Sequence, residues 1–298
     1  PGATHAAYDP IRHQLDEELV TDWLEGLDVV FTVETPNDWR MPLWCREMGV
    51  KLVIQGNPEF VRHGREGFEH LAHPDQWWWP TKWRTDILPA GVHMPVPMPD
   101  TVPVERNDDD VPLRVLHVVG KRAYADRNGT EILVSALRRV RRKMHVTSIG
   151  LDGERPKVQA GPSNRNLTVE YHPDGFDNHW DMYRNQDVLV TPRRYGGLQL
   201  PALEAAACGL AVMMPDCSPN AELASVLVPV RRAATLSLAA GTIRTAEVAP
   251  LDLSEHLDRL AWDRNSLIQA KDTSQALVPR WSMWRQRYLD RLQEVVSR

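Results

Sequence analysis

Residues 188–212 constrain the fold more than any other part of this 298-residue chain. The apolar run 188–190 is typical of a strand buried in a parallel sheet. Gly196-Gly197 then lets the backbone approach a ligand closely, and Pro201 suits the first turn of a helix. A second apolar run follows at 211–214. Strand, glycine-bearing turn, helix and strand in this order predict an α/β fold with a parallel sheet.

The turn in this segment has the chemistry of an anion site. Arg193 and Arg194 precede the glycines, and the start of the following helix offers unpaired amides and the positive end of its dipole. We therefore predict that a diphosphate binds here. Glu204, placed in the first helical turn, can tune the dipole or reach past the phosphates to the hydroxyls of a sugar.

This segment resembles the donor-site motif of the retaining group 1, or family four, glycosyltransferases, which have two Rossmann-like domains in the GT-B fold. Their pattern is Glu-Gly-Phe-Gly-Leu-Pro-x-Leu-Glu-Ala. Its elements from the first glycine onward fall on Gly197, Leu198, Gln199, Leu200-Pro201 and Glu204, whereas Gly196 stands where the family has its first glutamate. The resemblance implies that Glu204 binds the nucleotide ribose. It assigns no side chain to the donor-sugar contact that the first glutamate makes.

A second segment fits the same resemblance. The apolar strand 113–119 leads into a basic loop, 120–129, and a helix is predicted over 130–143. The resemblance implies that bases of this loop hold the donor diphosphate, with Lys121 or Arg122 and Arg127 as the counterparts. The catalytic candidates are therefore Lys121, Arg127 and Glu204. The donor-binding candidates are Gly120, Arg122, Arg193, Arg194, Tyr195, Gly196, Gly197, Leu198, Gln199 and Leu200.

The rest of the chain predicts two domains. Strands at 28–33 and 51–55 flank a helix near 37–48, and residues 76–88 predict a strand or turn followed by a helix. A proline-rich stretch over 94–112 marks a linker, so we expect an N-terminal domain over 1–105 and a C-terminal domain over 106–280. The C-terminal domain is expected to have strands near 113–119, 145–149, 167–171, 187–191 and 211–214 and helices near 130–143, 178–185 and 200–208.

The last segment, 281–298, predicts a helix with an aromatic and apolar face. The resemblance implies that this helix crosses back to pack on the N-terminal domain. The expected fold class is therefore α/β, with two Rossmann-like doubly wound domains facing a cleft and a short N-terminal domain.

Polar residues follow two predicted strands of the first domain. Glu34 comes after the strand 28–33, and Asn57 and Glu59 come after the strand 51–55. Carboxyl ends of parallel strands form the ligand edge of a doubly wound sheet. These three residues are candidates for acceptor contact or for deprotonating an acceptor hydroxyl. Ordinary loop polarity and helix capping are the alternative.

Composition narrows the function classes. The net charge of −5 argues against a protein held mainly by nucleic-acid phosphates, although the basic run 138–143 could meet an anionic acceptor or DNA. No set of histidines and carboxylates defines a metal site, so we expect neither metal nor cofactor.

The run Trp77–Trp79, with Trp83, could stack on a sugar, although alternation would bury one side of it. No apolar stretch reaches the roughly 20 residues of a membrane span, and we expect a cytoplasmic protein.

We therefore predict a glycosyltransferase that moves a sugar from a nucleoside diphosphate sugar to an acceptor hydroxyl, without metal and with retention. A small molecule, glycan, protein or DNA could be the acceptor. The alternatives are a nucleotide-sugar epimerase of the same fold, a catalytically weakened nucleotide-sugar-binding module, and a sugar transferase that modifies DNA bases.

Overall fold

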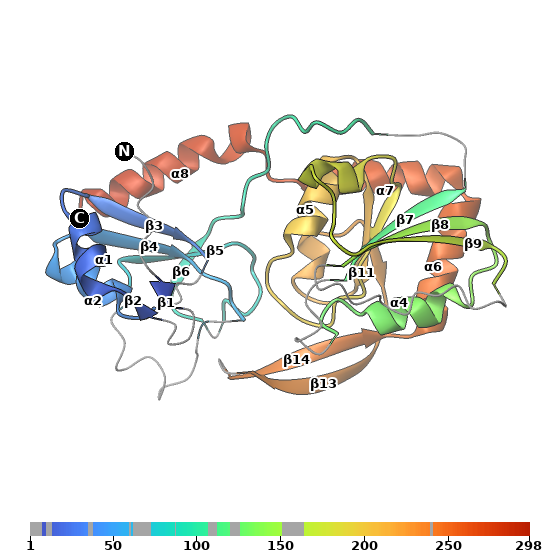
Figure 1. The fold of residues 1–298 in the computed structure, drawn as a ribbon, viewed down its shortest axis with the longest axis horizontal. Coiled ribbons are helices and arrows are strands. Elements are labelled where there is room, and N and C mark those ends of the chain that lie inside the picture. Colours follow the sequence, from blue (N-terminus) through green and yellow to red (C-terminus); the bar gives the residue numbers. More distant parts are fainter. Residues whose placement is uncertain are drawn as a thin grey trace. The chain divides into compact units, whose positions relative to one another are not determined.

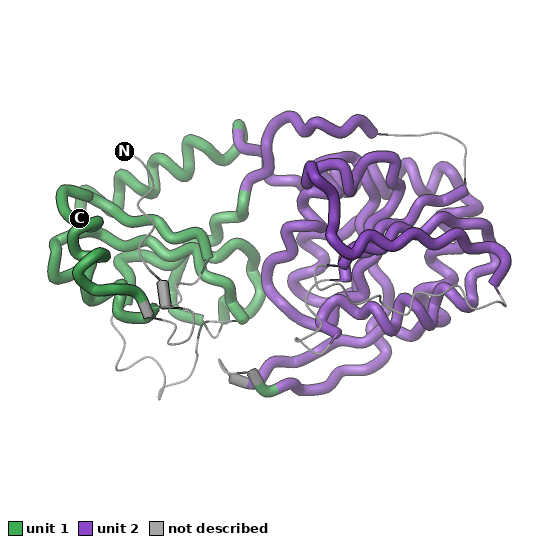
Figure 2. The backbone as a smooth tube through the Cα atoms, viewed as in Figure 1, with its two compact units in different colours: residues 1–96, 237–241, 282–298 green, residues 97–236, 242–281 purple. Residues whose placement is uncertain are grey.

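The computed structural model describes residues 8–9, 14–34, 38–59, 61, 73–86, 88–106, 112–119, 126–150, 164–238 and 241–298. The chain divides into two compact units (Figure 2). Unit 1 consists of residues 1–96, 237–241 and 282–298, and unit 2 consists of residues 97–236 and 242–281. Each unit contains its own parallel sheet, and each is described separately.

Unit 1 is built on a four-stranded parallel sheet. Its strand order is β3 (Val29–Val33), β4 (Lys51–Gln55), β5 (Gln76–Trp79) and β6 (Gly91–His93). Two helices, α1 (Glu17–Leu24) and α2 (Met41–Glu47), pack on one face of the sheet, and α8 (Trp281–Val296) packs on the other (Figure 1). A short antiparallel pair, β1 (Tyr8–Asp9) and β2 (Gln14–Leu15), precedes α1. Both faces of this sheet are thus covered, as is usual for parallel sheets.

The three consecutive tryptophans of β5 contribute to the hydrophobic clusters on both faces of the sheet. Trp77 and Trp79 stack on each other with ring centroids 5.1 Å apart, within the cluster that α1 and α2 complete. Trp78 points the opposite way and meets the ring of Tyr288 of α8 edge-on, at 5.1 Å between centroids. All three are at most 3% exposed. None of the three is therefore exposed enough to stack on a sugar, because α8 covers the side that Trp78 faces.

Unit 2 is a doubly wound α/β domain with a six-stranded parallel sheet. The strand order is β12-β11-β10-β7-β8-β9. The strands are β7 (Leu113–Val118), β8 (Met144–Ile149), β9 (Leu167–His172), β10 (Val188–Val190), β11 (Ala211–Pro215) and β12 (Val226–Val228). The predicted fold class, α/β with two Rossmann-like domains, is confirmed.

In the part of unit 2 that the structure describes, four α-helices surround this sheet. They are α4 (Thr130–Leu137), α5 (Leu200–Ala207), α6 (Pro250–Trp262) and α7 (Arg264–Leu277). Side chains of α4, α6 and α7 share one hydrophobic cluster with the strands, and α5 packs against β10 and β11. Two 3₁₀ helices, η2 (His179–Tyr183) and η3 (Asn220–Glu222), lie in the connections.

Several predicted boundaries differ from those observed. The first predicted helix begins at Met41 rather than near residue 37, and the helix expected over 178–185 is the 3₁₀ helix η2. The helix predicted over 130–143 ends at Leu137. The chain turns beyond it because the backbone amides of Arg141 and Arg142 donate to the Asp258 carboxylate of α6. In the described part of 76–88, β5 is followed by turns and no helix.

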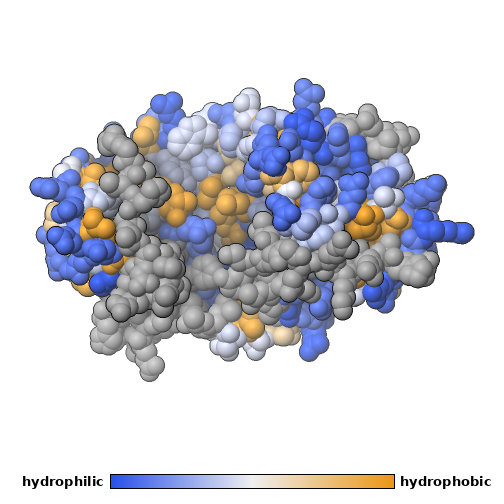
Figure 3. Space-filling model, in the orientation of Figure 1, coloured by the Kyte–Doolittle hydropathy of each residue, from blue (hydrophilic) through white to orange (hydrophobic). Residues whose placement is uncertain are grey.

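The sequence analysis missed the region between β11 and α8. It contains β12, a two-stranded hairpin of β13 (Val230–Leu238) and β14 (Gly241–Val248), and the helices α6 and α7. Among the described residues on the face drawn in Figure 3, hydrophobic side chains occur in separate groups between hydrophilic ones. Across the described ranges, no helix combines the length and the apolar character needed to cross a membrane.

Candidate functional site

The topology of unit 2 defines where a ligand would bind. β7 and β10 are neighbours in the sheet, but the chain continues from β7 toward β8 on one side and from β10 toward β11 on the other. In doubly wound sheets the crevice at such a switch point, at the carboxyl ends of the strands, is the ligand site. The loops that follow β7 and β10 are the two loops that the sequence predicts for the diphosphate.

These two loops are in direct contact. The Arg194 amide donates to the Arg127 carbonyl oxygen at 2.9 Å, and the Arg127 Nε donates to the Tyr195 carbonyl oxygen at 3.3 Å. Gly129 has φ +72°, and a Cβ at this position would collide with the Pro192 carbonyl. Only glycine tolerates both the left-handed backbone and this close approach, so Gly129 allows the loops to meet.

Two arginines converge on Gly196. The Nε atoms of Arg193 and Arg127 both donate to the Tyr195 carbonyl oxygen, at 2.9 and 3.3 Å. Gly196 has φ +125°, and a Cβ on it would collide with Nη2 of each arginine. Arg193 is only 5% exposed. The loop therefore holds two guanidinium groups against one glycine, where their planar donors can meet phosphate oxygens.

The third arginine of the loop is held by the hairpin. Arg194 forms an ion pair with Glu247 of β14, with 2.7 Å between Nη2 and Oε1. The Ala246 amide also donates to the Arg194 carbonyl oxygen at 2.8 Å. Glu247 and Ala246 of the hairpin thus stabilise the position of Arg194 in the loop after β10. The sequence analysis missed both because it missed the hairpin.

The two helices that begin at these loops differ at their N-termini. At α4, the Asp126 carboxylate accepts from the amides of Thr130 and Glu131 at 2.8 and 3.1 Å, so these donors are already engaged. At α5, no side chain caps the helix. Pro201 has no amide proton, and the Ala202 and Leu203 amides donate to the Gln199 carbonyl oxygen at 3.1 and 3.4 Å, so α5 can offer an anion mainly the positive end of its dipole and the Leu200 amide.

Gln199, at the start of α5, contains a buried polar atom without a partner. Its Nε2 donates to Thr191 Oγ1 at 3.0 Å, whereas its Oε1 has no hydrogen-bond partner in the part of the chain that the structure describes. The residue is 4% exposed. Buried acceptors without a donor are rare in folded proteins, and a ligand hydroxyl could satisfy this one.

Glu204 lies on the second turn of α5, not on the first turn as predicted, because the helix begins at Leu200. Its Oε2 accepts from the Tyr183 hydroxyl at 2.5 Å and lies 3.0 Å from His179 Nε2. Burial raises the pKa of Tyr183 well above its usual range, and the Glu204 charge adds to this effect. Tyr183 therefore stays protonated and donates. Sequence analysis named neither residue, although both belong to the segment it predicted as a helix.

The structure describes four of the other predicted donor-side residues and leaves three outside the described ranges. Tyr195 lies beneath the Arg127 guanidinium, 5.3 Å from its ring centroid, and Gly197 is buried. Leu198 is half-buried and Leu200 is 40% exposed. Gly120, Lys121 and Arg122 lie outside the described residues.

The predicted acceptor-side residues lie in unit 1, after two neighbouring strands. Glu34 follows β3, is exposed, and donates its amide to the Gln55 carbonyl oxygen at 3.0 Å. Asn57 is half-buried, and Glu59 is 4% exposed after β4. Burial lowers the pKa of Arg84, and the charges of Asp86 and Glu59 oppose that effect. The buried Glu59 carboxylate thus lies in the field of an arginine, whereas Glu34 is open to solvent.

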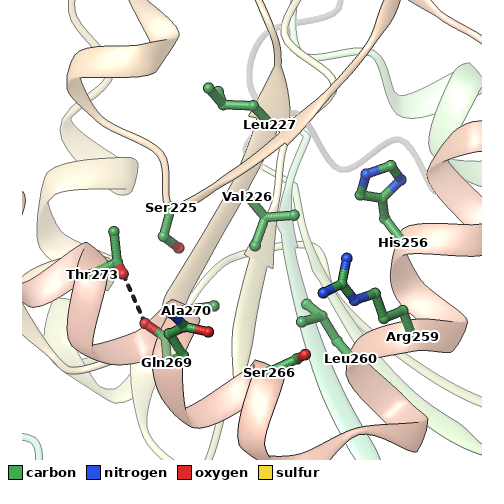
Figure 4. A pocket seen from close by; sticks show the side chains of 10 residues that line it. All are labelled: Ser225, Val226, Leu227, His256, Arg259, Leu260, Ser266, Gln269, Ala270 and Thr273. Carbon is green, nitrogen blue, oxygen red and sulfur yellow. Dashed lines mark hydrogen bonds between the residues drawn. The ribbon is translucent and has the colours of Figure 1, made fainter.

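Neither a metal site nor a separate pocket adds to the candidate site formed by the two loops. Within the described ranges, no three His, Cys, Asp or Glu side chains are grouped so that they could hold a metal ion. A separate pocket of about 310 Å³ lies between β12, α6 and α7 (Figure 4). Several of its hydroxyls are already engaged, since Thr273 donates to the Gln269 carbonyl oxygen and Ser266 to Asp263. None of the predicted site residues lines it.

Part of unit 2 matches a known protein family. Residues 114–245 match the family described as glycosyl transferases group 1. No curated protein sequence matches the chain.

Solved structures similar to the chain are glycosyltransferases. The lipopolysaccharide outer core galactosyltransferase WaaB is 13% identical, with a TM-score of 0.61 over 95% of this chain and 80% of that one. The pneumococcal O-GlcNAc transferase GtfA, in complex with UDP and GlcNAc, is 13% identical, with a TM-score of 0.65 over 94% of this chain and 60% of that one. HepE of Anabaena, in complex with UDP and glucose, is 11% identical, with a TM-score of 0.62 over 93% and 81%. At these identities the likeness shows a shared fold.

Proposed function

Because residues 114–245 belong to the group 1 glycosyltransferases, we propose that the chain moves a sugar from a nucleoside diphosphate donor to an acceptor hydroxyl. The predicted class, a group 1 glycosyltransferase of GT-B fold, is confirmed. The family match gives the class, and the solved neighbours give the fold. The donor, the stereochemistry and the independence from metal are part of the proposal.

The convergence of Arg193 and Arg127 on Gly196 is the observation that carries the proposal. When a sugar leaves a diphosphate, negative charge develops on the departing oxygen. Fixed guanidinium groups and helix amides aimed at that charge lower the barrier because they need no reorganisation during the reaction. The start of α5, which follows Arg193 by a few residues in the chain and has no side-chain cap, adds the positive end of a helix dipole. This arrangement supplies positive charge from the protein, which supports transfer without a metal ion.

The remaining roles follow the family resemblance. Glu204 would accept hydrogen bonds from the nucleotide ribose, and retention of anomeric configuration is the expected outcome. Two structural neighbours are recorded in complex with UDP, which makes uridine diphosphate the first donor nucleotide to test. Glu34, Asn57 and Glu59 are the proposed acceptor-side residues, since they follow strands β3 and β4 of unit 1.

The test is a donor-binding screen followed by two substitutions. Thermal shift and sugar hydrolysis would be measured with UDP, GDP, ADP and dTDP sugars, with and without EDTA. With the donor that binds, Arg193→Ala and Glu204→Ala should each lower affinity about tenfold or more, since each removes a hydrogen bond involving a charged group. Arg232→Ala, which removes an exposed arginine of β13, is the matched control and should change affinity less than twofold. Unchanged affinity in both site variants would contradict the proposal.

One observation favours a second candidate, a nucleotide-sugar-binding module with little turnover. Gly196 provides no carboxylate where the resembling family has one, and its φ of +125° is a backbone conformation that side chains rarely adopt. Tight donor binding without transfer or hydrolysis for any sugar would support this candidate. Turnover with any acceptor, unaffected by EDTA, would support the transferase.

A further inference from the structure

We propose that His179 and Tyr183 are positioning residues that hold Glu204 for the donor ribose and thereby make the site prefer ribonucleotides over deoxyribonucleotides. This inference rests on the proposed function, because it assigns the ligand of the same site. It concerns two residues of η2 that act through Glu204 and do not themselves carry out the chemistry.

Both residues bind the same carboxylate oxygen. The Tyr183 hydroxyl donates to Glu204 Oε2 at 2.5 Å, and His179 Nε2 lies 3.0 Å from that atom. The other oxygen, Oε1, accepts no hydrogen bond from any residue that the structure describes. A carboxylate with two oxygens can accept about four hydrogen bonds, so half of its capacity is left for a ligand. Two adjacent ribose hydroxyls are donors that fit this remaining capacity.

The two residues that bind the Glu204 carboxylate differ in their exposure to solvent. Tyr183 is fully buried and anchors Glu204 from the interior, whereas the His179 side chain is 53% exposed. Glu204 itself is 15% exposed, so it is accessible at one side. The imidazole is in turn placed by ring contacts with Trp180 and Tyr183, with centroids 5.7 and 6.0 Å away.

The segment that presents these side chains is locally stabilised. Asn178 caps η2, with its Oδ1 accepting from the Trp180 amide at 3.1 Å. η2 lies directly before β10, the strand that leads into the arginine loop. His179, Tyr183, Arg193 and Glu204 are therefore presented by consecutive parts of one stretch of chain, whereas Arg127 comes from the loop after β7.

Two side chains beside Glu204 have raised pKa values. Burial, followed by the Glu204 charge, raises the pKa of the Cys208 thiol to about 12, and the same two causes raise the pKa of Tyr183. Both groups stay protonated at neutral pH, and the Tyr183 hydroxyl donates its proton to Glu204 Oε2. The free side of the carboxylate is thus suited to hydroxyl donors such as those of ribose.

The test compares ligands with and without the ribose hydroxyls. Dissociation constants would be measured by calorimetry for UDP and 2′,3′-dideoxy-UDP, or for the corresponding pair of whichever nucleoside diphosphate binds. The native protein should prefer the ribonucleotide at least tenfold. His179→Ala should reduce that preference to threefold or less while leaving dideoxynucleotide affinity within twofold. His179→Gln should restore it, because the glutamine amide can donate to Oε2.

Two further variants provide a second test of the positioning role and a matched control. Tyr183→Phe should also reduce the preference, and its melting temperature would be recorded because this side chain is buried. His256→Ala, at a half-buried histidine of α6, is the matched control and should preserve the preference.

The outcomes separate this inference from the function on which it rests. An unchanged ribose preference in His179→Ala, or an equal loss of affinity for both ligands, would overturn the positioning role while nucleotide binding itself stands. If no nucleoside diphosphate binds the native protein, both proposals fail.

Discussion

The two units contain the same kind of sheet but are secured in different ways. In unit 1, large aromatic side chains fill both faces, and Trp78 packs between the sheet and α8. In unit 2, aliphatic side chains form the core, and a buried ion network lies at the amino ends of the strands. A sheet can therefore be stabilised mainly by aromatic burial or by a combination of close packing and buried charge.

The carboxyl ends of the strands also differ. In unit 2, the loops after β7 and β10 are tied to each other by backbone and arginine hydrogen bonds. In unit 1, the last residue of β4, Gln55, directs its side chain toward α8, donating to Tyr288 Oη and the Met94 carbonyl oxygen at 2.9 Å each. A polar residue at a strand end is thus structural in unit 1, whereas the corresponding region of unit 2 forms the proposed ligand site.

Aromatic burial in unit 1 predicts the largest effect of a single substitution. Trp78→Ala should lower the free energy of unfolding of unit 1 by about 3–5 kcal/mol, because it leaves a cavity against α8. Denaturant unfolding, followed by tryptophan fluorescence and circular dichroism, would measure the loss. Trp23→Ala, at a tryptophan 44% exposed on α1, is the control and should lose about 1 kcal/mol or less. Equal losses in the two variants would mean that α8 does not depend on this contact.

Buried charge in unit 2 predicts a somewhat smaller effect. Asp187 is 1% exposed and accepts from Arg114 Nε at 2.9 Å and Lys271 Nζ at 2.8 Å. Asp187→Ala would leave Lys271 buried without this partner and should cost about 3 kcal/mol. Lys271→Met should be less destabilising, because Arg114 still pairs with Asp187 and methionine fills a similar volume. A larger loss in Lys271→Met than in Asp187→Ala would contradict this account.

The same network predicts a pH dependence. Burial alone would raise the pKa of Asp187, but hydrogen bonds from Arg114 and Lys271 outweigh it and hold this pKa below its usual value. The stabilisation is therefore present above the unfolded-state pKa of about 3.9 and is lost as the pH falls through the lower folded-state value. Acid titration of the free energy of unfolding should show a shallower decline below about pH 4 in Asp187→Ala than in the native protein.

The sequence predicted most strands of the two parallel sheets and the arginine loop, but not the surroundings of the loop. Strand runs such as 188–190 can be recognised in the sequence because a parallel sheet buries continuous apolar stretches. The hairpin was missed because β13 is largely exposed and contains arginine, serine and alanine rather than an apolar run. Since Glu247 lies on that hairpin, its pairing with Arg194 could not be inferred.

The partners of Glu204 were missed for a different reason. His179 and Tyr183 precede it by more than 20 residues, and only the packing of η2 beside α5 brings the side chains together. Local sequence patterns do not predict such tertiary pairs. The alternation in β5 did predict that Trp78 faces away from Trp77, but covering that face required α8, which lies about 200 residues later in the chain.

Backbone strain at the ends of elements predicts the smallest difference between the units. Glu34 in unit 1 has φ +83°, a conformation that is costly for a residue with a Cβ, whereas Asn185 in unit 2 has φ +58°, which asparagine tolerates well. Glu34→Gly should therefore stabilise unit 1 by about 0.5–1 kcal/mol, and Asn185→Gly should change unit 2 by only a few tenths of a kcal/mol. Denaturant midpoints measured at pH 7 would compare the two. If Glu34→Gly destabilises unit 1 instead, its side chain makes contacts that outweigh the strain, and an acceptor role for this carboxylate would have to accommodate them.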